Sequence, residues 1–354
     1  LLEQSWAPVF RKEILPELPV EQVAPFYSEQ NGAPTKELYA MLGLMLAQQT
    51  FDLTDKEAVR QFAFNFEWHH ALGIGDDSDQ SAYVSEKTMW NMRRLLTEHD
   101  LYQAMFEIPT KKLAELCGVD LSLQRLDSVH VFSNMRHLGR IGLFVRTIKK
   151  FLHNLKRQCP GSSGFGKLEK ELSERYLHKQ KTSAFSMVKP SETTKTLQSL
   201  AEDLLVIVRC FKEDAKVNSM SSYKLLMRLF EEQCVTENGE DGGERIQVRP
   251  NKEIASDSLQ NPSDPDAGYD GYKGQGYQVQ IAETYSTAEE EPALSLITHV
   301  AVEAADKHDC GALIPALERA QKLGLAPEKI LADTAYGSDD NHQKAQEQGV
   351  GLIA

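Results

Sequence analysis

The chain has 354 residues and a formal net charge of −13, which is enough for two domains or for one domain with a large insertion. No apolar run reaches the roughly 18 residues that a membrane span needs, and the N-terminus has neither the basic nor the apolar segment of a secretory signal. The five cysteines form no Cys-x-x-Cys pair, which argues against a disulfide framework or a structural zinc site and favours a reducing cytoplasm. The absence of an initiating methionine suggests a fragment.

Residues 1–118 are predicted to be entirely helical. A first long helix follows Pro34 and extends to residue 48, and its apolar residues surround it almost completely, which is typical of a buried helix. The segment 54–57, Thr-Asp-Lys-Glu, has the spacing of a capping box, and Ser85 has the position of another N-cap. Pro109 is expected to divide two short helices, 101–107 and 111–117, before Gly118 ends the domain.

The helix after Ser85 is predicted to point Lys87, Arg93 and Arg94 outward, opposite an apolar face. Such a basic face suits the phosphates of DNA. Taken alone, the pattern favours the plainer interpretation, a solvated helix face on a structural domain. The loop before Ser85 is also too long for a tight helix-turn-helix.

Residues 121–132 alternate apolar and polar side chains and are rich in β-formers, which predicts a strand with Asp127 at its middle. Because Leu126, Val129 and Val131 cannot all lie on one face, we expect a central strand that is covered on both sides. Asp127 would then be a buried carboxylate, which requires a cation or a hydrogen-bond donor. Ion pairing with Arg125 is the structural alternative to metal ligation.

Residues 135–181 carry many more cations than acids, although the whole chain is acidic. Ile141, Phe144, Ile148 and Phe151 recur at helical spacing, so this block begins with an amphipathic helix whose cations suit phosphate binding. A membrane-surface helix is disfavoured because the helix has no Trp and lies in mid-chain. Further helices at 192–211 and 221–234 predict a helical insertion over 136–245 that ends in an acidic linker, 235–244. Its candidates for DNA contact are Arg136, Arg140, Arg146, Lys149 and Lys150.

The second half is predicted to complete a mixed sheet. Strands at 273–283 and 294–302 form an antiparallel pair, and a helix capped by Asp309 runs to Gly324. Residues 330–333 form a short buried strand that places Asp333 at its carboxyl end, where ligands collect in α/β sheets. A helix, 338–348, and a last strand, 350–353, follow. The Asp264-Pro265 pair favours a turn.

Four segments together resemble bacterial insertion-sequence DDE transposases. They are Leu126-Asp127-Ser128, residues 264–267 (DPDA) before 276–279 (GYQV), His308-Asp309 at the start of a helix, and residues 332–337 (ADTAYG). Residues 53–59 and 88–93 are similar to the helical DNA-binding domain that such transposases carry. The resemblance spans nearly the whole chain.

The resemblance implies a helical DNA-binding domain at 1–118 and an RNase H-like catalytic domain at 119–354, an α/β fold whose mixed sheet is interrupted by the insertion. Asp127 and Asp333 match the family's first two acids, which hold Mg²⁺ or Mn²⁺ for phosphoryl transfer, with His308 and Asp309 as outer-shell residues. The resemblance also implies a bacterial cytoplasmic protein associated with the nucleoid. Such a protein would act as a homodimer on double-stranded DNA, namely the inverted-repeat ends of its own transposon and a target DNA.

The family's third acid is a glutamate on a helix after the fifth strand, and no residue here matches it. Asp339, Asp340 and Glu347 precede the last predicted strand. We therefore expect a C-terminally truncated chain with weak or no strand cleavage. Two other functions remain open: a DNA-binding remnant or relative without catalysis, and a host RNase H-like nuclease, which the helical N-terminal domain makes less favoured.

Overall fold

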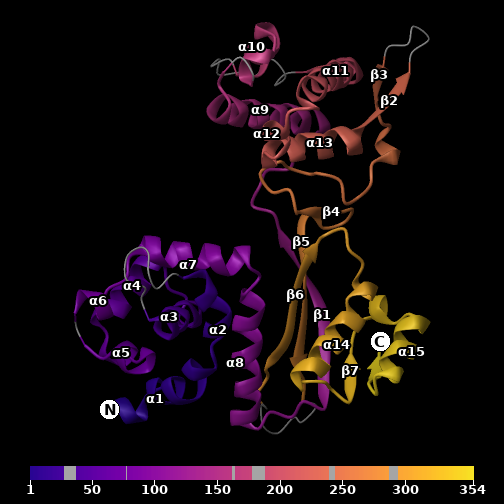
Figure 1. The fold of residues 1–354 in the computed structure, drawn as a ribbon. Coiled ribbons are helices and arrows are strands. Elements are labelled where there is room, and N and C mark those ends of the chain that lie inside the picture. Colours follow the sequence, from indigo (N-terminus) through magenta and orange to yellow (C-terminus); the bar gives the residue numbers. More distant parts are fainter. Residues whose placement is uncertain (28–36, 77, 162–163, 178–187, 239–243, 287–293) are drawn as a thin grey trace. The chain divides into compact units, whose positions relative to one another are not determined.

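The computed structural model describes residues 1–354 except 28–36, 77, 162–163, 178–187, 239–243 and 287–293 (Figure 1). The chain is mixed α/β and divides into two compact units, each described here by itself. The first unit comprises residues 1–127, 281–300 and 310–354, and the second comprises 128–280 and 301–309. The domain limits inferred from the sequence stay predictions.

Helices make up the N-terminal part of the first unit. Their bounds are α1 Ala7–Val9, α2 Val20–Val23, α3 Leu38–Thr50, α4 Asp55–Phe64, α5 Phe66–Leu72, α6 Asp79–Ala82, α7 Glu86–Glu98 and α8 Tyr102–Cys117. Short 3₁₀ turns at Leu2–Gln4, Leu15–Glu17 and Ala24–Phe26, and a π-turn at Phe10–Ile14, link the first of these. Helix α3 is buried nearly all round, as predicted. A side chain at Gly43 would collide with Leu72 and Leu15, so this glycine permits the close packing of α3.

Two predicted helix starts are confirmed. The Thr54 hydroxyl accepts the amide of Glu57 at 3.3 Å, and the Glu57 carboxylate accepts the Thr54 amide at 2.9 Å, which completes the capping box. Ser85 caps α7 by accepting the amide of Thr88 at 3.2 Å. The division at Pro109 is wrong, because α8 continues through it. Pro109 is itself buried in that helix, and packing outweighs the hydrogen bond that proline removes.

The sheet has the order β4-β5-β1-β7-β8, and β6 also pairs with β5. The strands are β1 Leu123–Phe132, β4 Gly268–Asp270, β5 Gly274–Thr284, β6 Ile297–Ala304, β7 Lys329–Leu331 and β8 Gly351–Ile353. Strand β7 is parallel to both β1 and β8. Strand β5 is antiparallel to β1, because backbone hydrogen bonds join Ser133 to Gln275 at one end and Leu123 to Tyr285 at the other.

Helices α14 Leu313–Leu323 and α15 Asp339–Glu347 lie beside β7 in Figure 1. They cover one face of the sheet, where Leu126, Leu313, Ile330 and Tyr336 share a hydrophobic cluster. Gly324 ends α14 in the left-handed conformation, as predicted. The predicted cap at Asp309 is wrong: a 3₁₀ turn, Asp309–Gly311, intervenes, and the N-cap of α14 is Ala312.

An ion pair joins α8 to α14 within the first unit. The Glu107 side chain is only 4% exposed and receives a bidentate contact from the Arg319 guanidinium, whose Nε lies 2.5 Å from Glu107 Oε1. Replacing Arg319 by Met is expected to lower the free energy of unfolding by about 2 kcal/mol, because the carboxylate stays buried without its cation. This value is below the range for a fully buried pair, since the Arg319 side chain is 43% exposed.

Denaturant unfolding would measure this effect. Arg94→Met is the matched control, because it breaks an exposed pair with Glu98, one helical turn away at 3.7 Å, which is worth about 0.5 kcal/mol or less. If both variants lost the same free energy of unfolding, the buried ion pair would contribute no more to stability than the exposed one.

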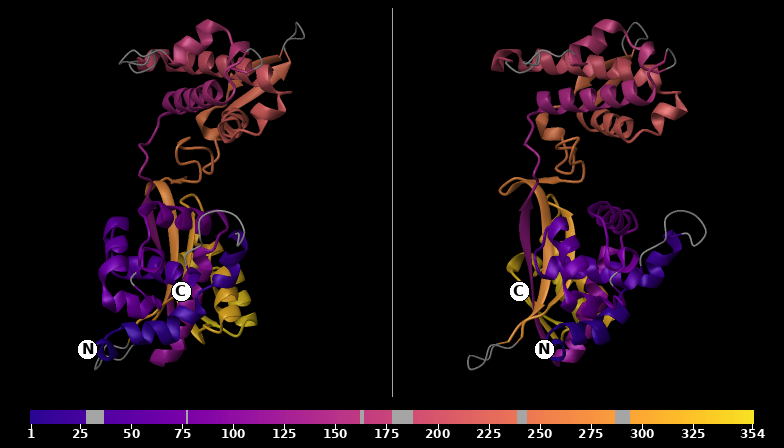
Figure 2. Two further views of the ribbon diagram at one scale, coloured as in Figure 1. Left: turned by 60° about the vertical axis from the view of Figure 1, so that its left-hand side comes forward. Right: turned by 90° about the vertical axis from the view of Figure 1, so that its left-hand side faces the viewer.

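The second unit contains most of the chain between β1 and β5. Its helices are α9 Arg140–Gln158, α10 Lys170–Leu177, α11 Thr193–Phe211, α12 Ala215–Asn218 and α13 Ser221–Gln233, with short 3₁₀ turns at Phe165–Lys167, Pro190–Glu192 and Asn251–Glu253. They appear in magenta to salmon in Figure 2. The predicted apolar face of α9 is confirmed, with Phe144, Ile148 and Phe151 in the core of this unit.

The predicted linker at 235–244 is partly wrong. Strands β2 Cys234–Asn238 and β3 Glu244–Val248 form an antiparallel hairpin in which Cys234 pairs with Val248. Ile246 is buried in the core shared with α11 and α13, and this packing overrides the polar composition on which the linker prediction rested. Residues 239–243 of that segment lie outside the described residues.

Candidate functional site

The predicted catalytic carboxylate of Asp127 lies on β1, and that of Asp333 lies two residues after the neighbouring strand β7, both in the first unit. Strands β1 and β7 are parallel, and Arg125 is the partner of Leu331 at the last paired position. Asp127 lies two residues beyond Arg125, and Asp333 two residues beyond Leu331, so extending the register past its last pair would bring the two acids level with each other. Adjacent strands are about 4.8 Å apart, and side chains at paired positions of a parallel ladder point to the same face.

Both carboxylates are exposed, so the prediction that they are buried is wrong. Side chains alternate along β1: Gln124 and Leu126 are 1% exposed, whereas Arg125 and Asp127 are on the open face. The helices cover only the face that carries Leu126. This one-sided cover also exposes Val129 and Val131, contrary to the expectation of a strand covered on both sides.

Backbone turns position Asp333. Its Oδ1 accepts the amide of Ala335 at 2.9 Å, so that Asp333 caps the 3₁₀ turn Thr334–Tyr336. Tyr336 is completely buried and anchors this turn in the sheet cluster. The short turn therefore fixes the carboxylate just beyond the end of β7.

The donor set fits a divalent metal ion in part. Carboxylate oxygens are the ligands that Mg²⁺ prefers, and Mg²⁺ keeps several waters when one or two carboxylates bind it. Within the described ranges, no group of three His, Cys, Asp or Glu side chains is arranged to hold a metal. Asp340, on α15, instead pairs with Lys344 at 2.7 Å. Two carboxylates on one exposed sheet face are thus the candidate metal ligands.

The predicted outer-shell residues His308 and Asp309 fall in the second unit. His308 is exposed, and Asp309 Oδ1 accepts the side-chain amide of Gln280 at 3.1 Å. The turn predicted at Asp264-Pro265 is confirmed, because Pro265 and Asp266 form a turn directly after Asp264. Asp264 accepts the hydroxyls of Ser133 and Tyr277. Burial and this carboxylate raise the pKa of Tyr277.

The predicted basic face of α7 is only partly free. Lys87 and Arg94 are exposed, and the Arg94 guanidinium lies 5.3 Å from the centre of the Trp90 ring. Arg93 instead turns toward α4, where its Nη2 lies 2.6 Å from Asp55 Oδ1. That ion pair ties α7 to α4, so Arg93 has a structural partner that the outward-facing pattern did not predict.

The Asp55–Arg93 pair makes the helical part sensitive to acid. The hydrogen bond from Arg93 lowers the pKa of Asp55 below its usual value, so the pair stabilises the fold above the unfolded pKa of about 4. This contribution, about 1 kcal/mol for a pair so exposed, is lost as the pH falls through the lowered pKa. We expect the stability gap between wild type and Arg93→Met to be present at pH 7 and to close by about pH 2.

Denaturant unfolding at the two pH values measures that gap. Arg60→Met, which removes an exposed cation from α4, is the control and should give a small, pH-independent gap. A gap for Arg93→Met that persisted at pH 2 would contradict the role given to Asp55.

The predicted DNA-contact residues of the second unit divide into two groups. Arg140 donates to Gln233 at 2.9 Å and to Asn251 at 2.6 Å, and Lys150 donates to the carbonyl of Pro262. Arg136, Arg146 and Lys149 are exposed. Two further exposed cations of α9, Lys156 and Arg157, were not selected from the sequence, although the helical period of Arg146 and Lys149 continues to them.

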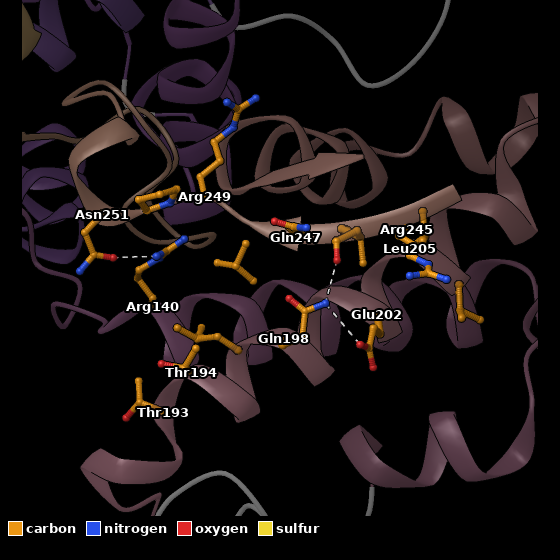
Figure 3. A pocket seen from close by; sticks show the side chains of 15 residues that line it. Arg140, Thr193, Thr194, Gln198, Glu202, Leu205, Arg245, Gln247, Arg249 and Asn251 are labelled. Carbon is orange, nitrogen blue, oxygen red and sulfur yellow. Dashed lines mark hydrogen bonds between the residues drawn. The ribbon is translucent and has the colours of Figure 1, made fainter. Parts of the chain in front are cut away.

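A cleft of about 890 Å³ lies between α11 and β3 in the second unit (Figure 3). Arg140, held by Asn251, lines one end, and Gln198 donates to the carbonyl of Ile246 at 2.7 Å beneath β3. Burial lowers the pKa of Arg140. The sequence did not predict this cleft, because it depends on the hairpin β2–β3.

Residues 10–95 match the family model described as a transposase domain, DUF772. The matched segment covers the helices from the π-turn at Phe10 to most of α7 and does not reach the sheet. No curated protein and no solved structure gives a significant match to the chain. Across the described residues, no helix combines the length and the apolar character needed to cross a bilayer.

Proposed function

We propose that the protein is a DNA transposase with an RNase H-like catalytic sheet. The transposase-domain match over residues 10–95 supports the class of protein. The observation that supports the catalytic proposal is the parallel register of β1 and β7, whose last pair, Arg125 and Leu331, lies two residues before each acid. In the DDE transposases that the sequence resembles, the first acid lies on the first strand and the second follows the fourth strand. If the sheet strands are counted in chain order without the short β4, then β1 is the first strand and β7 is the fourth.

Asp127 and Asp333 would hold a divalent ion, Mg²⁺ or Mn²⁺, through hard oxygen ligands. When bound, such an ion would activate a water or a 3′-hydroxyl as the nucleophile and stabilise the leaving oxygen of a phosphodiester. The protein's own contribution is placement. Strand β1 holds Asp127 rigidly, and the capped turn after β7 fixes Asp333, so both carboxylates meet a substrate phosphate on the open face of the sheet.

The DNA substrates would be the inverted-repeat ends of the element and a target duplex. Within the matched helices, Lys87 and Arg94 on α7 are the exposed cations that we assign to phosphate contact. Two ends must be brought together, which supports a homodimer on DNA. The protein would act in the bacterial cytoplasm, at the nucleoid.

One observation favours a second candidate, a DNA-binding protein without catalysis. Among the described residues, no third acid completes a metal group with Asp127 and Asp333. Such a protein would bind the ends of an element and compete with an active enzyme.

Incubating the 354-residue protein with end-containing duplexes and Mg²⁺ or Mn²⁺ distinguishes the two candidates. Weak metal-dependent nicking at the ends, abolished by EDTA, is expected for the transposase, because the described residues hold no third acid that completes its metal site. Tight end binding with no nicking under either metal would overturn the catalytic proposal and support the second candidate.

A further inference from the structure

One face of α9 carries a line of exposed cations. Successive helix residues are rotated by about 100°, and this rotation places five exposed side chains within an arc of about 100°. We call them the α9 stripe: Arg146, Lys149, His153, Lys156 and Arg157.

The opposite face of α9 fixes the stripe in place. Phe144, Ile148, Phe151 and Leu155 are completely buried. Phe151 also packs against the rings of Phe211 and Tyr223, with centroid distances of 5.8 and 5.5 Å. Because these contacts prevent the helix from rotating, the stripe is a preformed surface.

Among the residues that the structure describes, no acidic side chain neutralises the cations of the stripe. Helix α9 contains no Asp or Glu, and across the described ranges no ion pair involves Arg146, Lys149, Lys156 or Arg157. Lys156 instead lies 5.6 Å from the Phe165 ring centre, and Arg157 donates to Asn154 at 3.4 Å. A chain with a net charge of −13 thus concentrates free cations on one helix face.

The shape of the stripe favours duplex DNA as its partner. From Arg146 to Arg157 the helix rises about 17 Å, which is more than the roughly 12 Å width of the major groove. Cations along this line can therefore reach several phosphates of one duplex. A membrane surface is a poor partner, because the large apolar side chains of α9 face the core and none is available to enter a bilayer.

We propose that the α9 stripe binds the phosphate backbone of duplex DNA without reading its sequence. This would give the second unit a DNA contact of its own, in addition to the helices that match the transposase domain. The choice of DNA as the partner rests on the proposed function, whereas metal binding by Asp127 and Asp333 plays no part in it.

The test compares two sets of four substitutions in the 354-residue protein. The first set removes the four Arg and Lys side chains of the stripe: Arg146→Ser, Lys149→Ser, Lys156→Ser and Arg157→Ser. The control set removes four exposed lysines from α11 to α13 and the segments joining them: Lys195→Ser, Lys212→Ser, Lys216→Ser and Lys224→Ser. Both sets change the net charge equally, and all eight side chains are exposed, so thermal unfolding should show intact folds.

Binding to a random-sequence 40-bp duplex is measured without divalent metal at several salt concentrations. Each phosphate contact adds about 0.9 to the slope of log K against log salt, so losing four contacts should lower the slope by about 3 to 4. At low salt, the affinity of the stripe variant for this duplex should fall at least about 30-fold. The control set should leave the slope unchanged. The double variant Arg146→Ser/Lys149→Ser should show about half of the change in slope that the four-residue variant shows.

Equal slopes for wild type and the stripe variant would overturn the proposal. Loss of binding to polyglutamate or anionic vesicles, with DNA binding unchanged, would assign the stripe to an acidic protein or a membrane and would also overturn it. The assay contains no divalent metal, so it can detect DNA binding by the stripe even if the protein does not cleave DNA. Conversely, the protein can cleave DNA even if the stripe does not bind it.

Discussion

Replacing Asp127 by Asn is expected to lower metal-dependent nicking of element ends at least about 100-fold, equivalent to about 2.7 kcal/mol of transition-state stabilisation. Asparagine keeps the size of the side chain but removes the charge that would hold the metal ion. Asp127 is exposed, so the fold should tolerate the change. Affinity for the same duplex without metal should stay within about twofold of wild type, an estimate of less than 0.5 kcal/mol.

Asp333→Asn should have an effect of similar size. The double variant should lose little more than either single variant, because residues that act on one metal site are strongly non-additive. Asp339→Asn is the control: Asp339 is an exposed acid of α15, and its replacement should leave nicking unchanged. Full nicking activity in either Asp127→Asn or Asp333→Asn would remove that residue from the proposed site.

Phe151→Ala is expected to destabilise the second unit by about 3 to 5 kcal/mol, the usual cost of deleting a buried phenyl ring. Phe151 is completely buried and contacts the rings of Phe211 and Tyr223. The helical and sheet clusters of the first unit contain none of these side chains. The loss should therefore be confined to the second unit.

Hydrogen exchange followed by mass spectrometry can localise this effect. Amides of α9, α11 and α13 should exchange much faster in Phe151→Ala, whereas those of α3 and α7 should keep their protection. Phe66→Ala is the control, because the Phe66 side chain is 82% exposed and its removal should cost about 0.5 kcal/mol or less. Equal loss of protection in both units would contradict the separate stability of their cores.

Local sequence patterns predicted most of the helices. The capping box at Thr54, the cap at Ser85 and the apolar face of α9 depend on neighbouring residues and are confirmed. The errors arose where distant packing decides the outcome. Helix α8 continues through Pro109 because its buried side chains hold it, and β2–β3 forms because Ile246 enters a core built by other helices.

The candidate site was predictable in its residues but not in its geometry. Apolar strands around Asp127 and before Asp333 marked both acids, yet strand register depends on pairing between distant segments. The error about burial has a similar cause. A sequence shows that a strand alternates, but it does not show whether one or both faces are covered. In this structure α14 and α15 cover the face that carries Leu126, and Asp127 points the other way.

The hydrogen bond from the Ser133 amide to the carbonyl of Gln275, at 3.1 Å, has a consequence for how such a chain can evolve. Ser133 follows the last residue of β1, and Gln275 lies at the start of the adjacent antiparallel strand β5. The hydrogen bond therefore holds these two residues side by side, and the segment with α9 to α13 and the β2–β3 hairpin is inserted between them. A tight turn could join the same two points without disturbing the register of the sheet. In this geometry, the length of the inserted segment can change while β1, which carries Asp127, keeps its pairing with β5.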